Sequence, residues 1–220
     1  MTPAKPMLMF VHGLLSTPLD FGEQVSAMPD DLQGSAPWLR GARPGATGER
    51  FDLVSAAADL AMSIELSGAP RTTLFGVGEG ALVGLEVTLS RPDLPVDLVV
   101  AGPGLAAAAG ASTQRRLTSL IPRRMLAARG VDKNRALRGL EEIAEVDLWG
   151  RLPELRARVL LLVGERDRAG RAAAEAFTRQ ATEADVRTVV VRGAGASPHT
   201  QRPADVNAAL YEFIGVRPRG

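Results

Sequence analysis

The feature that most constrains the fold of this chain is an alternation of short apolar runs with segments of helical period. Several of the runs are continuous rather than alternating, which is typical of strands that are covered on both faces. The six runs are residues 7–11, 35–39, 72–76, 96–102, 158–164 and 186–193, of which 35–39 is the weakest. Strands separated by helices predict an α/β fold whose six-stranded sheet is mostly parallel and carries helices on both faces.

The segments between the apolar runs have the spacing of amphipathic helices. The clearest is residues 51–68, where apolar side chains recur at helical spacing and the pattern stops at Gly68. The other predicted helices are "LDFGEQVSAM", "EGALVGLEVTLSRP", "AGRAAAEAFTRQATEA" and "PADVNAALYEFIG".

One long segment, residues 104–155, contains helical patterns but no strand pattern. Insertions that follow the carboxyl end of a strand lie above the ligand crevice of such sheets. We therefore predict a core of residues 1–103 and 156–220 and a small helical lid of residues 104–155. The alternative is that these helices pack on the side of the sheet.

Composition excludes several classes of function. Lys and Arg number 26 against 25 Asp and Glu, so nothing indicates a nucleic-acid or membrane partner. The densest basic group is interpreted as a solvated helical face; it comprises Arg115, Arg116, Arg123, Arg124 and Arg129. The absence of cysteine and the presence of only two histidines exclude disulfides and a cysteine nucleophile and disfavour a metal site. The N-terminal apolar run is too short for a signal peptide, so we expect a cytoplasmic protein.

The glycine-rich turn "GVGEGA" at residues 76–81 lies between a predicted strand and a predicted helix. It fits the dinucleotide-binding pattern, whose glycines let the backbone approach a pyrophosphate. That function also needs an acidic residue at the tip of the next strand, and the next strand ends in "VVAGPG". We therefore predict no cofactor. The second interpretation is a G-x-S-x-G nucleophile elbow in which Gly78 stands in place of the serine.

Several motifs together resemble those of the α/β-hydrolase family over almost the whole chain. They are "FVHGLLSTPLDF", "APWLRGARPG", "LFGVGEGALVGLEVTLSRPDLPVDLVVAGP", "ARVLLLVGERD" and "VVVRGAGASPHTQRPADVNAALYEFI". The resemblance implies the α/β-hydrolase fold without the family's first two strands. It also implies that Asp167 is the triad acid and that the backbone amides of Leu14 and Glu79 form an oxyanion hole.

The departures from the family pattern concern the catalytic triad. Gly78 replaces the nucleophile, and Ala196 stands where the family has its histidine, with His199 three residues later. Glycine cannot form a covalent acyl intermediate, so the standard serine-hydrolase mechanism is excluded. A backbone oxyanion hole survives such changes and can stabilise an enolate.

The sequence therefore predicts an enzyme that performs a lyase, isomerase or cyclase step on a small carbonyl-containing metabolite. Candidate acids and bases are Asp167, His199, Glu79 and His12. Each also has a structural explanation: an ion pair of Asp167 with a neighbouring arginine, a position of Glu79 at a helix N-terminus, ordering of a turn by His12, and a solvent-edge position for His199. The alternatives are a pseudoenzyme that binds a ligand or partner, and an esterase whose catalytic residues are displaced or have been replaced. An exposed sheet edge at 35–39 would allow two copies to pair as a homodimer.

Overall fold

The computed structural model describes residues 4–45, 49–102, 116 and 118–216. In this part of the chain six strands form one sheet in the order β2-β1-β3-β4-β5-β6, and every neighbouring pair is parallel. The strands are β1 (Met7–Val11), β2 (Gln33–Ser35), β3 (Thr72–Val77), β4 (Val96–Ala101), β5 (Arg158–Gly164) and β6 (Asp185–Val191). The predicted α/β fold with a six-stranded parallel sheet is confirmed.

The predicted strand at 35–39 is wrong in its position. The edge strand β2 ends at Ser35 and pairs with β1 from Met7↔Gln33 to Met9↔Ser35. Pro37 follows two residues later, and proline has no N–H with which to extend a ladder. The other five strands agree with their apolar runs to within two residues.

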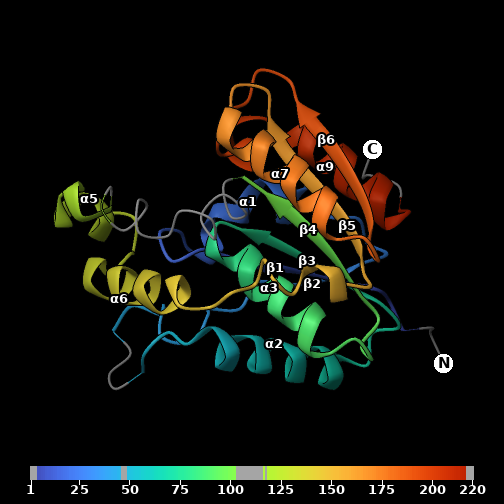
Figure 1. The fold of residues 1–220 in the computed structure, drawn as a ribbon, viewed down its shortest axis with the longest axis horizontal. Helices are drawn as coiled ribbons and strands as arrows, with labels where there is room; N and C mark the ends of the chain where they lie inside the picture. Colours follow the sequence, from blue (N-terminus) through green and yellow to red (C-terminus); the bar gives the residue numbers. More distant parts are fainter. Residues whose placement is uncertain (1–3, 46–48, 103–115, 117, 217–220) are drawn as a thin grey trace.

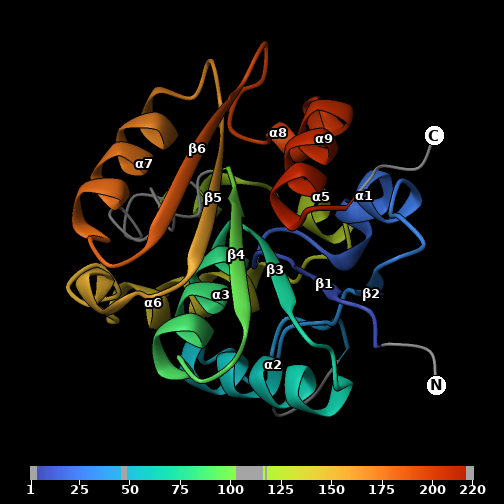
Figure 2. The same cartoon turned by 90° about the vertical axis from the view of Figure 1, so that its right-hand side faces the viewer.

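Helices cover both faces of the sheet (Figure 1 and Figure 2). One face packs on α2 (Leu53–Ser67), α3 (Glu79–Ser90) and α7 (Arg168–Gln180). The other packs on α9 (Pro203–Ile214), with α1 (Gly22–Ser26) beside α9. Strand residues alternate between the two cores, as the pleat requires: Leu74 belongs to the first core and Phe75 to the second.

The predicted insertion is described from residue 118 onward, together with residue 116, and its first part lies outside the described residues. It contains α5 (Arg123–Ala127), α6 (Lys133–Ala144) and a 3-10 turn, η2 (Leu152–Glu154). The buried side of α6, which includes Leu140 and Ile143, joins the core formed by α2 and α3. None of the helices in the described residues has the length and apolar character needed to cross a bilayer.

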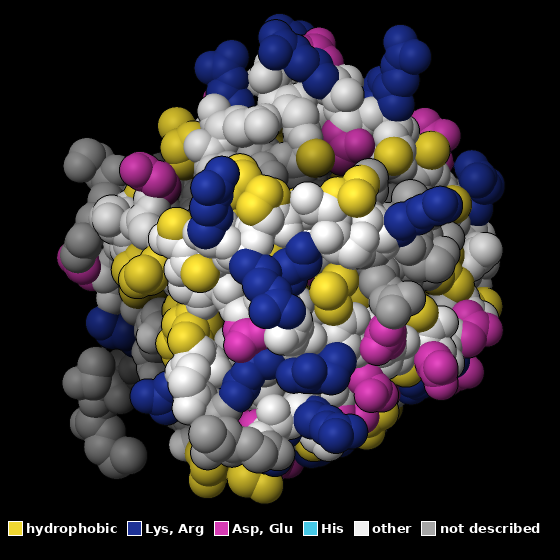
Figure 3. All heavy atoms as spheres, turned by 90° about the vertical axis from the view of Figure 1, so that its left-hand side faces the viewer, with side chains coloured by type: hydrophobic (Ala, Val, Ile, Leu, Met, Phe, Trp, Pro, Cys, Tyr) yellow, Lys and Arg dark blue, Asp and Glu magenta, His cyan; other side chains and the backbone are white. Residues whose placement is uncertain are grey.

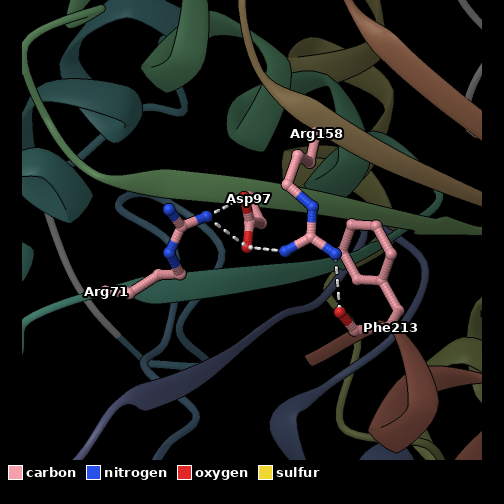
Figure 4. A network of polar contacts seen from close by, with 4 residues as sticks. All are labelled: Arg71, Asp97, Arg158 and Phe213. Atoms are coloured by element: carbon pink, nitrogen blue, oxygen red, sulfur yellow. Dashed lines mark hydrogen bonds and ion pairs between the residues drawn. The ribbon is translucent and has the colours of Figure 1, made fainter. Parts of the chain in front are cut away.

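A buried carboxylate ties together the end of the sheet opposite the glycine turn (Figure 4). Asp97 of β4 has a side chain only 3% exposed, and its oxygens lie 2.8 Å from Arg71 Nη1 and 3.2 Å from Arg158 Nη1. Arg158 also donates to the Phe213 carbonyl at 2.8 Å and stacks on the Phe213 ring at 4.5 Å. Asp97 therefore links β4, β5 and Arg71, the residue before β3, to the C-terminal helix α9.

We expect Asp97→Ala to lower the free energy of unfolding by about 2–4 kcal/mol, because it leaves two converging arginines without their buried partner. Urea denaturation measures the change. The matched control is Asp93→Ala, which removes one of the two carboxylate partners of Arg91 at an exposed site and should cost no more than about 1 kcal/mol. Equal losses in the two variants would contradict this role for Asp97.

Candidate active site

The glycine turn forms a sharp elbow between β3 and α3. Gly78 has φ 56° and ψ −131°, a left-handed conformation that strains any residue with a side chain. It lines a cavity of about 250 Å³ at the carboxyl edge of the parallel sheet, where ligands of such folds bind. The cavity suits a small metabolite, since it is smaller than the sites of drug-sized ligands.

The residues two before and two after Gly78 have no room for a side chain. A Cβ on Gly80 would lie 2.5 Å from the His12 carbonyl oxygen, and one on Gly76 would lie 2.6 Å from the Ala81 nitrogen. Among the described residues, a Cβ on Gly78 would meet only the Gly13 Cα, at 3.7 Å. The close approach of helix and strand that a nucleophile elbow requires is present, and space is open where its nucleophile would stand.

Glu79, the first residue of α3, is buried and turns back toward the loop after β1. Its Oε2 accepts a hydrogen bond of 2.8 Å from the Leu14 amide. This is one of the two amides that the family resemblance assigns to the oxyanion hole. In this structure a carboxylate oxygen of the chain itself lies where a substrate oxygen would bind that amide.

Gly13 makes this contact possible. A Cβ on Gly13 would lie 2.7 Å from Glu79 Oε2 and 3.0 Å from the Val77 carbonyl oxygen. The turn that holds Gly13 is fixed by Ser16, whose Oγ accepts from the Gly13 amide at 2.8 Å. The loop after β1 is therefore shaped to receive the Glu79 side chain.

His12 is fully buried, and backbone groups occupy both of its ring nitrogens. Nε2 accepts from the Leu39 amide at 3.1 Å, so the proton belongs on Nδ1, which lies 2.8 Å from the Gly13 carbonyl oxygen. Burial lowers the pKa of His12, and its backbone contacts and the nearby Asp20 partly oppose that shift. The neutral ring joins the β1 loop to the loop before α2.

His199 lines the same cavity as Gly78 and Glu79. It lies on α8 (Pro198–Gln201), a single turn anchored by Gln24, whose Nε2 donates to the His199 carbonyl at 3.0 Å. The ring is 4% exposed, packs against Phe21, and its Nδ1 has no hydrogen-bond partner among the described residues. Burial lowers the pKa of His199 to about 4, opposed by Asp20, so the imidazole is neutral at pH 7.

This lowered pKa predicts a loss of stability in mild acid. Between the unfolded pKa of about 6.5 and the folded pKa of about 4, only the unfolded chain binds the proton. The free energy of unfolding should therefore fall by roughly 2 kcal/mol more in wild type than in His199→Gln between pH 7 and pH 4.5. Urea denaturation at the two pH values measures the difference, and parallel losses in the two proteins would contradict the burial of a neutral ring.

Asp167 and Ala196 lie on adjoining loops and are not among the residues that line the cavity. Asp167 caps α7: its Oδ1 accepts from the Gly170 amide at 2.9 Å, and its Oδ2 is buried with no hydrogen-bond partner among the described residues. In the described part of the chain no hydrogen bond joins Asp167 to His199. The exposed Ala196 directs its carbonyl toward Gly102 at the end of β4.

Two charged cavity residues, Asp20 and Arg129, were not among the predicted acids and bases. Asp20 lies in η1 (Pro18–Phe21), and its Oδ2 is 3.9 Å from Arg129 Nη2, which comes from the segment between α5 and α6. Asp20 could have been found from the sequence, because it lies in the loop after the carboxyl end of a strand, where ligands of such folds bind.

On the face of the molecule seen in Figure 3, Lys and Arg side chains are spread among Asp and Glu side chains.

A larger groove of about 590 Å³ runs between α7 and the edge strand β6. It is lined by Val163, Arg171, Ala174, Glu175 and Val190, among others, and contains none of the predicted site residues. We place the candidate site in the smaller cavity, because the histidine, the carboxylates and the elbow meet there.

Among the described residues, the cavity combines a neutral imidazole, two carboxylates, a guanidinium and the hydroxyls of Ser16, Ser197 and Thr200 around Gly78, which has no nucleophilic side chain. Within the described residues no group of three or more His, Asp or Glu side chains is arranged to hold a metal ion. The arrangement suits proton transfer by positioned side chains.

No protein-family model matches this chain, and no curated protein matches its sequence. Solved structures do match its fold. MenH from S. aureus is 15% identical, with a TM-score of 0.80 over 97% of this chain and 95% of that chain. NosK from Streptomyces actuosus is 24% identical, with a TM-score of 0.75 over 96% and 98%. The enol-lactonase from Burkholderia xenovorans LB400 is 18% identical, with a TM-score of 0.71 over 97% and 92%. The chain therefore has the α/β-hydrolase fold.

Proposed function

We propose that this chain is a non-hydrolytic enzyme of the α/β-hydrolase fold that moves a proton on a small carbonyl-containing metabolite. One observation carries the proposal: the neutral imidazole of His199 lines the same cavity as Gly78, whose elbow offers space but no nucleophile. A neutral imidazole is a competent proton acceptor. Because the elbow has no nucleophile, the proposed reaction proceeds without a covalent bond between the substrate and the chain.

In the proposed reaction, His199 accepts a proton from the carbon next to the substrate carbonyl, and the C–H electron pair moves toward the carbonyl oxygen as an enolate forms. The imidazolium then gives the proton to another carbon, in an isomerase, or to a departing group, in a lyase. In a cyclase the enolate carbon instead bonds to an electrophilic carbon of the same molecule, and the imidazolium protonates the oxygen that receives the displaced electron pair.

The enolate oxygen needs a hydrogen-bond donor in a site shielded from water. We assign that role to the Leu14 amide, whose present acceptor, Glu79 Oε2 at 2.8 Å, would be replaced by the substrate oxygen. The segment that contains Arg129 acts in this proposal as a lid, because it contributes a wall of the cavity.

Deuterium exchange tests the proposal before the natural substrate is known. The purified protein is incubated in D₂O with a panel of small ketones, β-keto esters and aminoketones, and loss of the carbon-bound proton is followed by NMR. We expect exchange above the buffer rate for at least one compound, and no labelling by a fluorophosphonate probe. Absence of exchange across the panel, or stoichiometric fluorophosphonate labelling, would contradict the proposal.

A binding protein without catalysis is the second candidate function. The hydrogen bond from the Leu14 amide to Glu79 favours this second function. A protein that does not stabilise an oxyanion can use that amide for a contact within its own chain. The same experiment separates the two candidates: a pseudoenzyme shifts the NMR signals of a bound compound and leaves its exchange rate at the buffer value.

A further inference from the structure

The turn that carries His199 cannot hold its own shape. Helix α8 (Pro198–Gln201) is four residues long, and starting a helix costs more free energy than the hydrogen bonds of a single turn return. Among the described residues, no side chain caps α8 and none bonds the Nδ1 of His199. The Gln201 side chain accepts a hydrogen bond of 2.6 Å within its own loop, from the Gly195 amide. The place of the imidazole therefore depends on contacts that reach α8 from elsewhere in the fold.

Gln24 of α1 supplies such a contact from 175 positions away in the chain. Its Nε2 donates a hydrogen bond of 3.0 Å to the backbone carbonyl of His199. The Gln24 side chain is fully buried, and its Oε1 has no hydrogen-bond partner among the described residues. A buried amide that makes only part of its hydrogen bonds costs stability, and an apolar side chain of similar length would avoid that cost. Packing therefore does not explain an amide at this position, whereas the contact with α8 does.

The segment that carries Gln24, η1 with α1, is itself fixed on two sides. Toward the sheet, the Phe21 ring packs on Phe10 of β1 and Phe75 of β3, with ring centroids 5.1 and 5.7 Å apart. On the other side lies α9, as Figure 2 shows, and its Tyr211 hydroxyl donates to the Gln24 backbone carbonyl at 3.2 Å. Burial raises the pKa of Tyr211 to about 12, so this hydroxyl keeps its proton at pH 7. Gln24 is therefore a hydrogen-bond donor at a fixed position.

The same segment also contacts the imidazole directly. The rings of Phe21 and His199 have centroids 6.1 Å apart and planes inclined by 38°. The segment therefore holds His199 at two points, the ring through Phe21 and the backbone through Gln24. Without the backbone contact, nothing in this pair of contacts stops α8 from turning its ring away from Phe21 and into water.

We infer that Gln24 is a positioning residue of the proposed reaction, which keeps the His199 imidazole in the cavity wall by holding its backbone carbonyl. This inference rests on the proposed function and adds to it a residue outside the cavity. Gln24 is not among the residues that line the cavity, so it acts on the substrate through His199 and not by contact.

Gln24→Met tests the inference, because methionine keeps the length of the side chain and removes the donor. The chain has two histidines, so the NMR signals of the two imidazoles are assigned by their loss in His199→Gln. In wild type, burial holds the pKa of His199 at about 4, so its signals should stay constant between pH 7 and pH 5.5. In Gln24→Met the ring reaches water, its pKa returns toward the ordinary value of about 6.5, and its signals should shift over that range. Asp20, Glu79 and Arg129, which share the cavity with His199, are unchanged in this variant.

The second measurement is the kinetics of deuterium exchange. Gln24→Met should lower kcat at least tenfold and change KM less than threefold, because the substrate does not touch Gln24. The matched control is Gln33→Met, the same substitution at a side chain whose Nε2 also donates to a backbone carbonyl at 3.0 Å, that of Lys5. Gln33 lies outside the cavity, so this control should leave the exchange rate and the His199 signals as in wild type.

Constant His199 signals between pH 7 and pH 5.5 in folded Gln24→Met, or a kcat within threefold of wild type, would overturn the inference and leave the proposed function in place. If Gln24→Met does not fold, Tyr211→Phe decides by the same two measurements, with an expected loss in kcat of at least threefold. That variant keeps the ring and removes the hydroxyl that holds the Gln24 backbone. The NMR titration needs no substrate. If wild type catalyses no exchange, the proposed function fails, and the titration alone shows whether Gln24 holds the His199 ring.

Discussion

Gly80→Ala is expected to lower the free energy of unfolding by more than about 3 kcal/mol, a large effect for the addition of a single methyl group. The added Cβ would lie 2.5 Å from the His12 carbonyl oxygen and closer still to that of Val11. Both obstacles are backbone atoms of the interior strand β1 and the turn after it, and these cannot rotate away as a side chain can. Helix α3 would have to move off the sheet, and the elbow would open.

Two other glycines provide a graded comparison, measured by urea denaturation alongside Gly80→Ala. Gly22→Ala adds a Cβ with nothing within 4 Å at φ −51°, so it should change stability by less than about 1 kcal/mol. Gly78→Ala meets no backbone atom closer than 3.7 Å, but it forces a side chain into a left-handed conformation at a cost of about 1–3 kcal/mol. If the Gly80→Ala and Gly78→Ala variants have the same free energy of unfolding, the close contact between α3 and β1 does not stabilise the elbow.

His199→Gln is expected to lower the rate of enzyme-catalysed deuterium exchange by 10²- to 10⁴-fold, the range for loss of a general base. The wild-type rate should rise with pH as the imidazole loses its proton near pH 4 and should be flat above about pH 6. Glutamine can fill the space of the ring but cannot accept a proton at these pH values. The loss should therefore appear in kcat, with a smaller change in KM.

The control for His199→Gln is Thr178→Ala, which removes an intrahelical hydrogen bond of α7 outside the cavity. The Thr178→Ala variant should catalyse deuterium exchange at the wild-type rate. Two results would show that a group other than His199 is the base. One is an exchange rate for His199→Gln within threefold of wild type, and the other is a wild-type rate that keeps rising between pH 6 and pH 8.

Much of the fold could be predicted, because burial on both faces imposes a recognisable pattern on a parallel strand. The apolar run at 158–164 has the same bounds as the strand β5. The helix predicted to stop at Gly68 ends at that residue, which has φ 63°. The edge strand β2 was predicted at 35–39 instead of Gln33–Ser35, because only β1 pairs with it and its sequence needs neither a long apolar run nor full burial.

The candidate site was predictable only in part. The spacing of Gly76, Gly78 and Gly80 indicated an elbow, since close backbone approach restricts those positions to small residues. The contact between Glu79 and the Leu14 amide could not be predicted, because it depends on how two distant loops meet. The position of His199 also depends on tertiary structure: the short helix α8 places this residue in the cavity wall, although it lies three positions beyond Ala196.

The central claim is that this elbow carries proton transfer in place of hydrolysis, and isotope labelling of the product tests it most directly. A metabolite that accumulates when the gene is deleted is incubated with the purified protein in D₂O and, separately, in H₂¹⁸O, and the product is analysed by mass spectrometry. The account predicts a product with carbon-bound deuterium from D₂O and no ¹⁸O beyond that of the enzyme-free control. A product that gains one ¹⁸O from water and no carbon-bound deuterium would identify a hydrolase and contradict the account.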